Sequence, residues 1–448
     1  MSLNHEEQTA LAGKFAVDVL ERRTKICFVG MGRSGLTLAE TFTNAGFSVL
    51  GFDFDAVKIE KLKNGEIEDG VIPPETAKEL FASGRFDSTS DSRRFREADA
   101  IIFCVPTPLK DTRQPDMSLF AGGALALRPQ LRPGQLIILT GGAYPGATEE
   151  LFLPALAVSG LAAGCDYFLA YSPELGNSIS RTDLRHRVPR VIGAIDGISL
   201  GLAATLFGPV SGKLTPVEGI RVAEACPIVE SARQVVNTAL VRELKSVFEA
   251  MGINACEVLD ATNVNSADPV TRQGIPGQGS RHWPASPFHL TWAARRHGCD
   301  ARLIELAGEV MAAMPACVFQ RIGDALNEIG KPIKNSRILL LGAACDKDVS
   351  LSSGGLAPDL IEMLRQRGAE VSYNDPSISR LEIKGAGNIR LDSRPLSAEL
   401  LAEQDCVVIV TDHSAYDLDW ILGHATVVID TRNTTGPTPR GPCRVWKA

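Results

Sequence analysis

The stretch KICFVGMGRSGLTLAETFTNAGFSVLGFDFD, residues 25–55, decides the fold of the first part of this chain. It opens with a short apolar run, 25–30, which is rich in residues that favour β-strands and ends in a glycine. A segment with helical spacing follows to about Ala45, and a second apolar run, 48–55, closes the stretch. The pattern therefore predicts a β-α-β unit.

Gly30, Gly32 and Gly35 form a GxGxxG motif between the first predicted strand and the helix. The first glycine permits a tight turn, the second lets a pyrophosphate approach the backbone, and the third lets the helix pack on the strand. Asp53 closes the second strand roughly twenty residues further on, where a carboxylate binds a ribose diol and repels a 2′-phosphate. We therefore expect a site for NAD rather than NADP, the alternative being a glycine turn that binds nothing.

Further short apolar runs extend this first domain, with helical segments between several of them. They lie at Ala100–Val105, Gln135–Thr140, Tyr167–Tyr171 and Arg190–Gly193. Such an order predicts a mostly parallel sheet covered on both faces.

A second series of the same kind follows the polar, proline-containing break at 329–336. It consists of RILLLG (337–342), a helix near 355–367, AEVSYNDP (369–376), DCVVIVTD (405–412) and TVVIDTRN (426–433). The predicted class is α/β, with two Rossmann-like domains joined by a long central helical region.

Two long helical patterns separate the two series. From about Pro227 to Met251 apolar residues recur at helical spacing, and 301–329 forms another such stretch. Because Pro227 lacks an amide hydrogen and suits the first turn of a helix, we expect the first helix to begin there. The expected division is an N-terminal extension (1–24), a first domain (25–210), a central helical domain (211–330) and a third domain (333–448).

Composition narrows the class of protein and the kinds of partner. The 448 residues, 44% of them hydrophobic and 22% charged, are typical of two or three globular domains. A net charge of -7 argues against general affinity for nucleic acid or an anionic membrane, although a local basic pocket for a phosphate remains possible. The N-terminal segment 1–25 lacks an apolar core, so we expect a surface helix there rather than a signal peptide or membrane span.

The ten cysteines are scattered singly, without a CxxC pair or histidines at ligand spacing. Several, such as Cys104 and Cys406, lie within apolar runs, where a reduced thiol behaves as a small hydrophobic group. We expect no metal site and a reducing, cytoplasmic location.

Eight segments occur together and in a fixed order along the chain. They are 30–55, CVPTPL (104–109), YPGATEE (144–150), LAYSPE (169–174), NTALVRELK (237–245), PFHLTW (287–292), TDHSAY (411–416) and IDTRN (429–433). On these segments the chain resembles the UDP-glucose/GDP-mannose dehydrogenase family from about Lys25 to Asn433. Members of that family use two NAD to oxidise the C6 alcohol of a nucleotide sugar to a carboxylate.

The resemblance implies an N-terminal NAD domain, a dimer-forming central region and a C-terminal domain for the nucleotide part of the sugar. It also implies that Thr107 approaches NAD and that Glu174 lies beside the reacting carbon. Asn237 is expected among the residues that bind substrate. The expected partners are therefore a nucleotide sugar and a second copy of the chain.

The chain departs from the family pattern at positions that carry the chemistry. Where the family has a segment like PGxGGHCIPxDP, this chain has PGQGSRHWPASP at 276–287. His282 thereby replaces the nucleophilic cysteine that captures the aldehyde, and Ser286 replaces an aspartate. Without that thiol, the four-electron oxidation to an acid should be essentially absent.

Two further segments depart from the family pattern in the same way. At 223–231, AEACPIVES stands where the family has AEMxKLLEN, so Pro227 replaces the catalytic lysine and Ser231 an asparagine. In the loop 344–356, Ser353 replaces an arginine that grips the substrate and Asp346 replaces a lysine.

Three functions remain compatible with this pattern. In the first, His282 acts as general base on an alcohol while NAD takes one hydride, and Arg281 holds a carboxylate or phosphate of the substrate. The ordinary alternative is that both are solvated loop residues. In the second, the chain binds NAD or a nucleotide sugar without catalysis; in the third, NADH forms only transiently during epimerisation or elimination. In the first case NADH would accumulate, and in the second it would never form. In the third it would form and be consumed again in each turnover.

Overall fold

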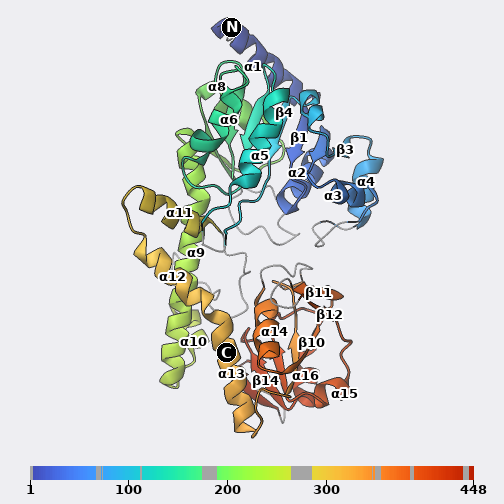
Figure 1. Cartoon of the computed structure of the whole chain (residues 1–448), viewed down its shortest axis with the longest axis vertical. Coiled ribbons are helices and arrows are strands. Elements are labelled where there is room, and N and C mark those ends of the chain that lie inside the picture. Colours follow the sequence, from blue (N-terminus) through green and yellow to red (C-terminus); the bar gives the residue numbers. More distant parts are fainter. Residues whose placement is uncertain are drawn as a thin grey trace. The chain divides into compact units, whose positions relative to one another are not determined.

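A computed structural model gives the fold of the chain (Figure 1). Its two compact units are described separately. The described residues are 4–66, 72, 74–110, 114–173, 189–263, 285–345, 347–348, 355–383, 388–436 and 443–448. The first unit comprises Met1–Ala232 and Pro284–Ala301, and the second comprises Arg233–Trp283 and Arg302–Ala448.

The first unit is built on an eight-stranded sheet of order β3-β2-β1-β4-β5-β6-β7-β8. Its strands are β1 Lys25–Val29, β2 Ser48–Phe52, β3 Phe86–Thr89, β4 Ala100–Phe103, β5 Leu136–Leu139, β6 Phe168–Tyr171, β7 Arg190–Ala194 and β8 Leu214–Pro216. All neighbours are parallel except β6 and β7, which confirms the predicted mostly parallel sheet.

Both faces of this sheet are covered. Alternate residues of β1 enter two different apolar clusters, with Ile26 and Phe28 on one side and Cys27 and Val29 on the other. The helices are α1 His5–Leu20, α2 Arg33–Asn44, α3 Ala56–Lys63, α4 Pro74–Ala82, α5 Ser118–Leu127, α6 Leu153–Ala157, α8 Gly197–Phe207 and α11 Ala285–Arg296. The expected N-terminal helix, α1, is more than a surface feature because it buries Phe15 in the first cluster.

The second unit contains a five-stranded parallel sheet of order β10-β9-β13-β14-β15. Its strands are β9 Arg337–Leu341, β10 Glu370–Asn374, β13 Cys406–Ile409, β14 Val427–Asp430 and β15 Arg444–Lys447, and β11 Arg380–Ile383 and β12 Ile389–Asp392 form a hairpin. Its helices are α10 Ala255–Asn263, α12 Arg302–Ala312, α13 Met314–Glu328, α14 Leu356–Gln366, α15 Ala398–Ala402 and α16 Leu418–His424. The predicted α/β class with two Rossmann-like sheets is confirmed.

The long helix α9 spans Gly219–Ala250, so the prediction that it begins at Pro227 is wrong. Proline in a helix interior removes one backbone hydrogen bond and bends the chain, but packing can outweigh that loss. Here the two turns before Pro227 place Ile220 and Ala223 in the buried core of the first unit. The stretch expected at 301–329 is likewise divided at Ala313, where α12 ends and α13 begins.

One helical stretch, Arg302–Glu328, is long and apolar enough to cross a membrane by length and composition alone. A single stretch of this kind is weak evidence for a membrane span. Within the described ranges, no group of three or more His, Cys, Asp or Glu side chains is placed to hold a metal ion.

Candidate functional site

The loop between β1 and α2 has the geometry of a phosphate cradle. Gly30 adopts φ +99°, which favours glycine, and its amide donates to the Phe52 carbonyl at 2.7 Å. A Cβ at Gly35 would overlap the carbonyl oxygen of Gly30, whereas a Cβ at Gly32 would meet no atom within 4 Å. The three positions therefore fit a tight turn, an open approach to the backbone and close helix–strand packing, as a bound pyrophosphate requires.

Asp53 lies at the end of β2, beside this loop. Its Oδ2 accepts a hydrogen bond from the Met31 amide at 2.9 Å and lies 3.1 Å from the Nζ atom of Lys58. Its Oδ1 accepts from the Asp55 amide at 3.1 Å, and 15% of the side chain remains exposed. The carboxylate is held in place but still open to a ribose diol.

Thr107 lies in the loop after β4, where its side chain is mostly buried and its hydroxyl donates to the Gly142 carbonyl. Thr140, at the end of β5, donates to the Phe103 carbonyl at 2.9 Å. These contacts tie together the loops that follow β4 and β5. Because the carboxyl ends of parallel strands face the ligand crevice in such sheets, Thr107 and the glycine loop lie at the same edge.

A buried histidine, His289 of α11, lies against this edge and was not singled out from the sequence. It is 1% exposed, and neither ring nitrogen has a hydrogen-bond partner among the described residues. Burial lowers its pKa to about 4, an effect that the backbone of Thr107 partly opposes. Its only signal in the sequence was a titratable residue within the mainly apolar segment PFHLTW (287–292), and burial of such a residue depends on tertiary packing.

Helix α11 is fastened to the first unit by a small cluster of side chains. Arg296 Nη1 lies 2.9 Å from Glu150 Oε2, and the ring of Trp292 lies 4.9 Å from that of Tyr144. The guanidinium of Arg296 also lies over the Trp292 ring, 4.9 Å from its centroid. The cluster fixes the helix that carries His289.

Glu224 of α9 is a buried carboxylate that binds the YPGATEE segment (144–150). Its carboxylate accepts hydrogen bonds from the Gly146 amide at 2.6 Å and from the amide and hydroxyl of Thr148 at 2.9 and 2.6 Å. Burial raises the pKa of this carboxyl, although the hydrogen bonds from Thr148 and Gly146 act in the opposite direction. The first part of α9 is thereby joined to the loop after β5.

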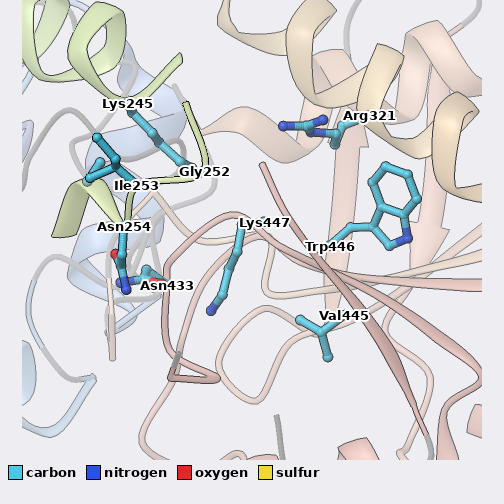
Figure 2. A pocket seen from close by; sticks show the side chains of 10 residues that line it. Lys245, Gly252, Ile253, Asn254, Arg321, Asn433, Val445, Trp446 and Lys447 are labelled. Atoms are coloured by element: carbon cyan, nitrogen blue, oxygen red, sulfur yellow. The ribbon is translucent and has the colours of Figure 1, made fainter. Parts of the chain in front are cut away.

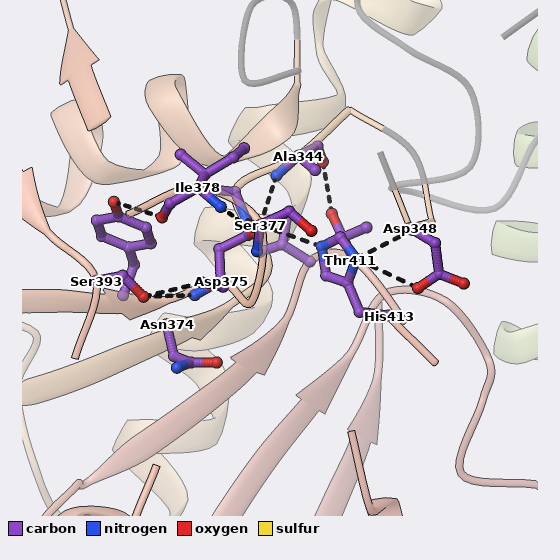
Figure 3. Close-up of polar contacts among 12 residues, drawn as sticks. Ala344, Asp348, Asn374, Asp375, Ser377, Ile378, Ser393, Thr411 and His413 are labelled. Carbon is purple, nitrogen blue, oxygen red and sulfur yellow. Dashed lines mark hydrogen bonds and ion pairs between the residues drawn. The ribbon is translucent and has the colours of Figure 1, made fainter. Parts of the chain in front are cut away.

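The second unit repeats the strand–loop–carboxylate arrangement with a different outcome (Figure 3). Asp375 follows β10 as Asp53 follows β2, and its Oδ2 accepts from the amides of Ala343 and Ala344 at 2.7 and 3.0 Å. The Nε2 atom of His413 lies 3.1 Å from the same oxygen, and both side chains are fully buried. This carboxylate is therefore not open to a ribose.

The position of the ring proton on His413 follows from its other contact. Nδ1 accepts a hydrogen bond from the Asp348 amide at 3.0 Å, so Nε2 carries the proton that is donated to Asp375. Burial opposes ionisation of Asp375, but hydrogen bonds from His413 and from the Ala343 and Ser377 amides hold its pKa below the usual range. The contact closes the loop after β9 onto the loops after β10 and β13.

Three segments of the chain match the three domains of one family. The NAD binding domain of the UDP-glucose/GDP-mannose dehydrogenase family matches residues 24–210, its central domain 221–312, and its UDP binding domain 339–437. The chain belongs to the UDP-glucose/GDP-mannose dehydrogenase family. The glycine cradle and Asp53 thus lie in the NAD-binding domain of an NAD-dependent dehydrogenase family.

Individual relatives of this chain are distant but match over most of their length. The chain is 26% identical over 393 residues to Protein CapL of Staphylococcus aureus, covering 87% of this chain and 90% of CapL. It is 27% identical over 429 residues to a UDP-N-acetyl-D-mannosamine dehydrogenase of Methanococcus maripaludis, covering 91% and 92%. The solved UDP-D-ManNAc dehydrogenase of Pyrococcus horikoshii has a TM-score of 0.82 at 24% identity, covering 94% and 98%, and so shows the same fold.

The structure places only some of the site residues expected from the dehydrogenase pattern. Those of the cofactor site come together at one edge of the first sheet, whereas Asn237 is a half-buried residue of α9 within the second unit. Glu174, Arg281, His282, Asp346 and Ser353 lie outside the described residues, whereas Ser286 lies in the first turn of α11.

Proposed function

We propose that this family member is an NAD-dependent oxidoreductase that oxidises a CH–OH group of a nucleotide sugar by one hydride transfer. The observation that carries the proposal is a complete NAD cradle in a chain whose sequence has His282 and Pro227 at the family's cysteine and lysine positions. Without a thiol to capture the aldehyde, the second oxidation lacks its covalent intermediate. The reaction therefore stops at an aldehyde or ketone.

The proposed roles follow from residue chemistry. When bound, NAD supplies a hydride acceptor, held by the glycine loop and Asp53 with Thr107 close by. In this proposal His282 takes the hydroxyl proton, Glu174 lies beside the reacting carbon, and Arg281 and Asn237 bind the substrate.

Two less specific assignments accompany this proposal. We assign 25–210 to NAD, 211–330 to dimerisation and 333–448 to the nucleotide end of the substrate, with 1–24 as an extension. A cytoplasmic location is supported by the cysteines whose side chains are described, all of which are free thiols.

The reaction is tested by incubating the protein with NAD and a panel of UDP- and GDP-sugars while reading NADH absorbance and product mass. We expect one NADH for each product molecule and a product that has lost two hydrogen atoms. His282→Ala should lower kcat by about 10²–10⁴-fold without changing NAD affinity. A carboxylate product would contradict the single-hydride proposal, and tight NAD binding without any product would favour a non-catalytic role.

We also propose that a second copy of the chain covers an apolar stripe along α9. The exposed large apolar residues of this helix and its end are Val222, Val229, Leu240, Val247 and Met251, each at least 44% exposed. At 3.6 residues per turn these five positions fall within a sector about 40° wide. A stripe of this kind is typical of a helix that packs against a partner helix.

The double substitution Val229→Asp with Val247→Asp should convert the dimer to a monomer, because it places carboxylates in the proposed apolar interface. Size-exclusion chromatography with light scattering measures the change. Val57→Asp on α3 is the matched control, since Val57 is equally exposed but lies on another element. A wild-type monomer, or a double variant that remains dimeric, would contradict this interface.

A further inference from the structure

His289 of α11 is a buried side chain whose hydrogen-bonding capacity is unused in the first unit. It is 1% exposed, and neither Nδ1 nor Nε2 has a hydrogen-bond partner among the described residues. A neutral imidazole has one N–H donor and one acceptor nitrogen, and leaving both unpaired away from water is unfavourable. The described part of the ligand-free chain thus lacks a contact that such a buried group normally has.

The position of the ring is fixed by the rest of α11. Trp292 and Arg296 lie three and seven residues after His289, so all three fall on one face of the helix. Arg296 is ion-paired with Glu150. Trp292 packs against the ring of Tyr144. Because this face of α11 is fastened to the first unit, the imidazole is held inside the protein.

The imidazole lies beside the loop that follows β4. The backbone of Thr107 acts on the ring and partly opposes the effect of burial on the pKa of His289. A backbone group that favours the protonated ring is a carbonyl oxygen, so the Thr107 carbonyl is close to the imidazole. Neither ring nitrogen makes a well-formed hydrogen bond within the described ranges, so the two groups are near each other but not yet paired.

This loop lies where the fold binds a dinucleotide. The strand order changes direction between β1 and β4, and ligands bind at such a point, outside the carboxyl ends of the strands. One side of the loop is already held, because the Thr107 hydroxyl donates to the Gly142 carbonyl. A Cβ at Gly141 would lie 2.5 Å from the Val105 carbonyl oxygen, so the loops after β4 and β5 are also in close contact. The contact with His289 is the one that remains to be made.

The cations that line a cavity of about 500 Å³ in the second unit differ from His289, because they already have partners (Figure 2). Lys447 is paired with Asp430, and Lys245 donates to the backbone oxygen of Ala448. Arg242, in an adjoining cavity, is 9% exposed, and its Nη1 atom is unpaired in the described part of the chain. Its charge alone does not define what would bind there.

We propose that His289 is a positioning residue of the NAD site. When NAD binds, the ring N–H of His289 donates to the Thr107 carbonyl and holds the loop after β4 against the cofactor. Hydrogen bonds in active sites are often long or poorly aligned in the empty protein and tighten in the complex. The inference rests on the proposed place of Thr107 close to NAD.

The test is a calorimetric titration of the full chain with NAD at neutral pH, together with thermal unfolding of the ligand-free protein. His289→Phe should lower NAD affinity by about tenfold, the typical effect of one lost hydrogen bond. Its ligand-free form should melt no earlier than wild type, because the nitrogens that it loses are unpaired there. His289→Gln and His289→Asn place an amide N–H near the positions of Nε2 and Nδ1, and one of the two should restore most of the affinity.

Tyr167→Phe is the matched control. It also removes a polar atom from a ring that is 1% exposed, but Tyr167 precedes β6, at the amino edge of the same sheet, so NAD affinity should stay at the wild-type value. The proposal is overturned if His289→Phe binds NAD as wild type does, or if the Phe, Gln and Asn variants lose affinity equally. A wild-type chain that bound no NAD would overturn the proposed function as well, so the two failures are distinct.

Discussion

Gly35→Ala should abolish NAD binding and destabilise the first unit, whereas Gly32→Ala should weaken NAD binding with little change in stability. The difference arises because a Cβ at Gly35 would overlap the backbone carbonyl of Gly30, while a Cβ at Gly32 would point into open space. The backbone of Gly30, in the tight turn between β1 and α2, cannot yield as a flexible side chain can, so Gly35→Ala should cost about 1–3 kcal/mol or more. At Gly32 the methyl group would occupy only the approach of the pyrophosphate.

Calorimetric titration with NAD and thermal unfolding separate the two effects. Gly122→Ala, inside α5 and with open space around its Cβ position, is the control for a glycine replaced in a helix and should be neutral or slightly stabilising. If Gly35→Ala bound NAD with wild-type affinity, the glycine loop would not be the pyrophosphate cradle.

Lowering the pH from 6.5 to 4 should remove up to about 3 kcal/mol of stability through His289 alone. Its pKa is lowered from 6.5 to about 4 in the folded chain, so the unfolded chain binds more protons throughout this interval. A depressed folded-state pKa in a base means that its contribution is fully present above pH 6.5 and declines as the pH falls toward 4. The folded chain therefore favours the neutral form of the buried imidazole.

His289→Phe should flatten this part of the stability profile, because phenylalanine fills similar space and does not titrate. Denaturant unfolding at a series of pH values provides the measurement. His297→Gln is the control, since His297 is an exposed residue just beyond the end of the same helix. An unchanged pH profile in His289→Phe would show that protonation of other groups causes the loss.

Local sequence patterns predicted most of the fold. The buried strands β1, β4 and β5 were recognised because each is a continuous apolar run. The edge strands β3 and β8 were missed because each is short and partly exposed, so that neither gives such a run. The N-terminal turns of α9 were missed because local geometry placed Pro227 in a first turn, while packing in the core decided otherwise.

The residues of the candidate sites likewise divide into those that local sequence predicts and those that depend on tertiary packing. Gly30, Gly35 and Asp53 could be predicted because the cofactor site is formed by residues close together in sequence. Arg242 and His289 could not, because each lies in a helical pattern that also contains other polar residues, and only tertiary packing buries it. The pattern alone leaves such a residue indistinguishable from one that faces solvent.

Asp53 and Asp375 follow corresponding strands of the two units, but substitutions at these two positions should have different effects. At Asp53, the carboxylate is partly open. A substitution there should lower the affinity for ligand while the core of the surrounding sheet stays intact. At Asp375, the carboxylate is enclosed by His413 and four backbone amides, so a substitution should lower the stability of the fold itself. The same position of the two folds thus serves ligand binding in the first unit and stability in the second. Retention of an aspartate at Asp375 among relatives would then be no evidence of a second cofactor.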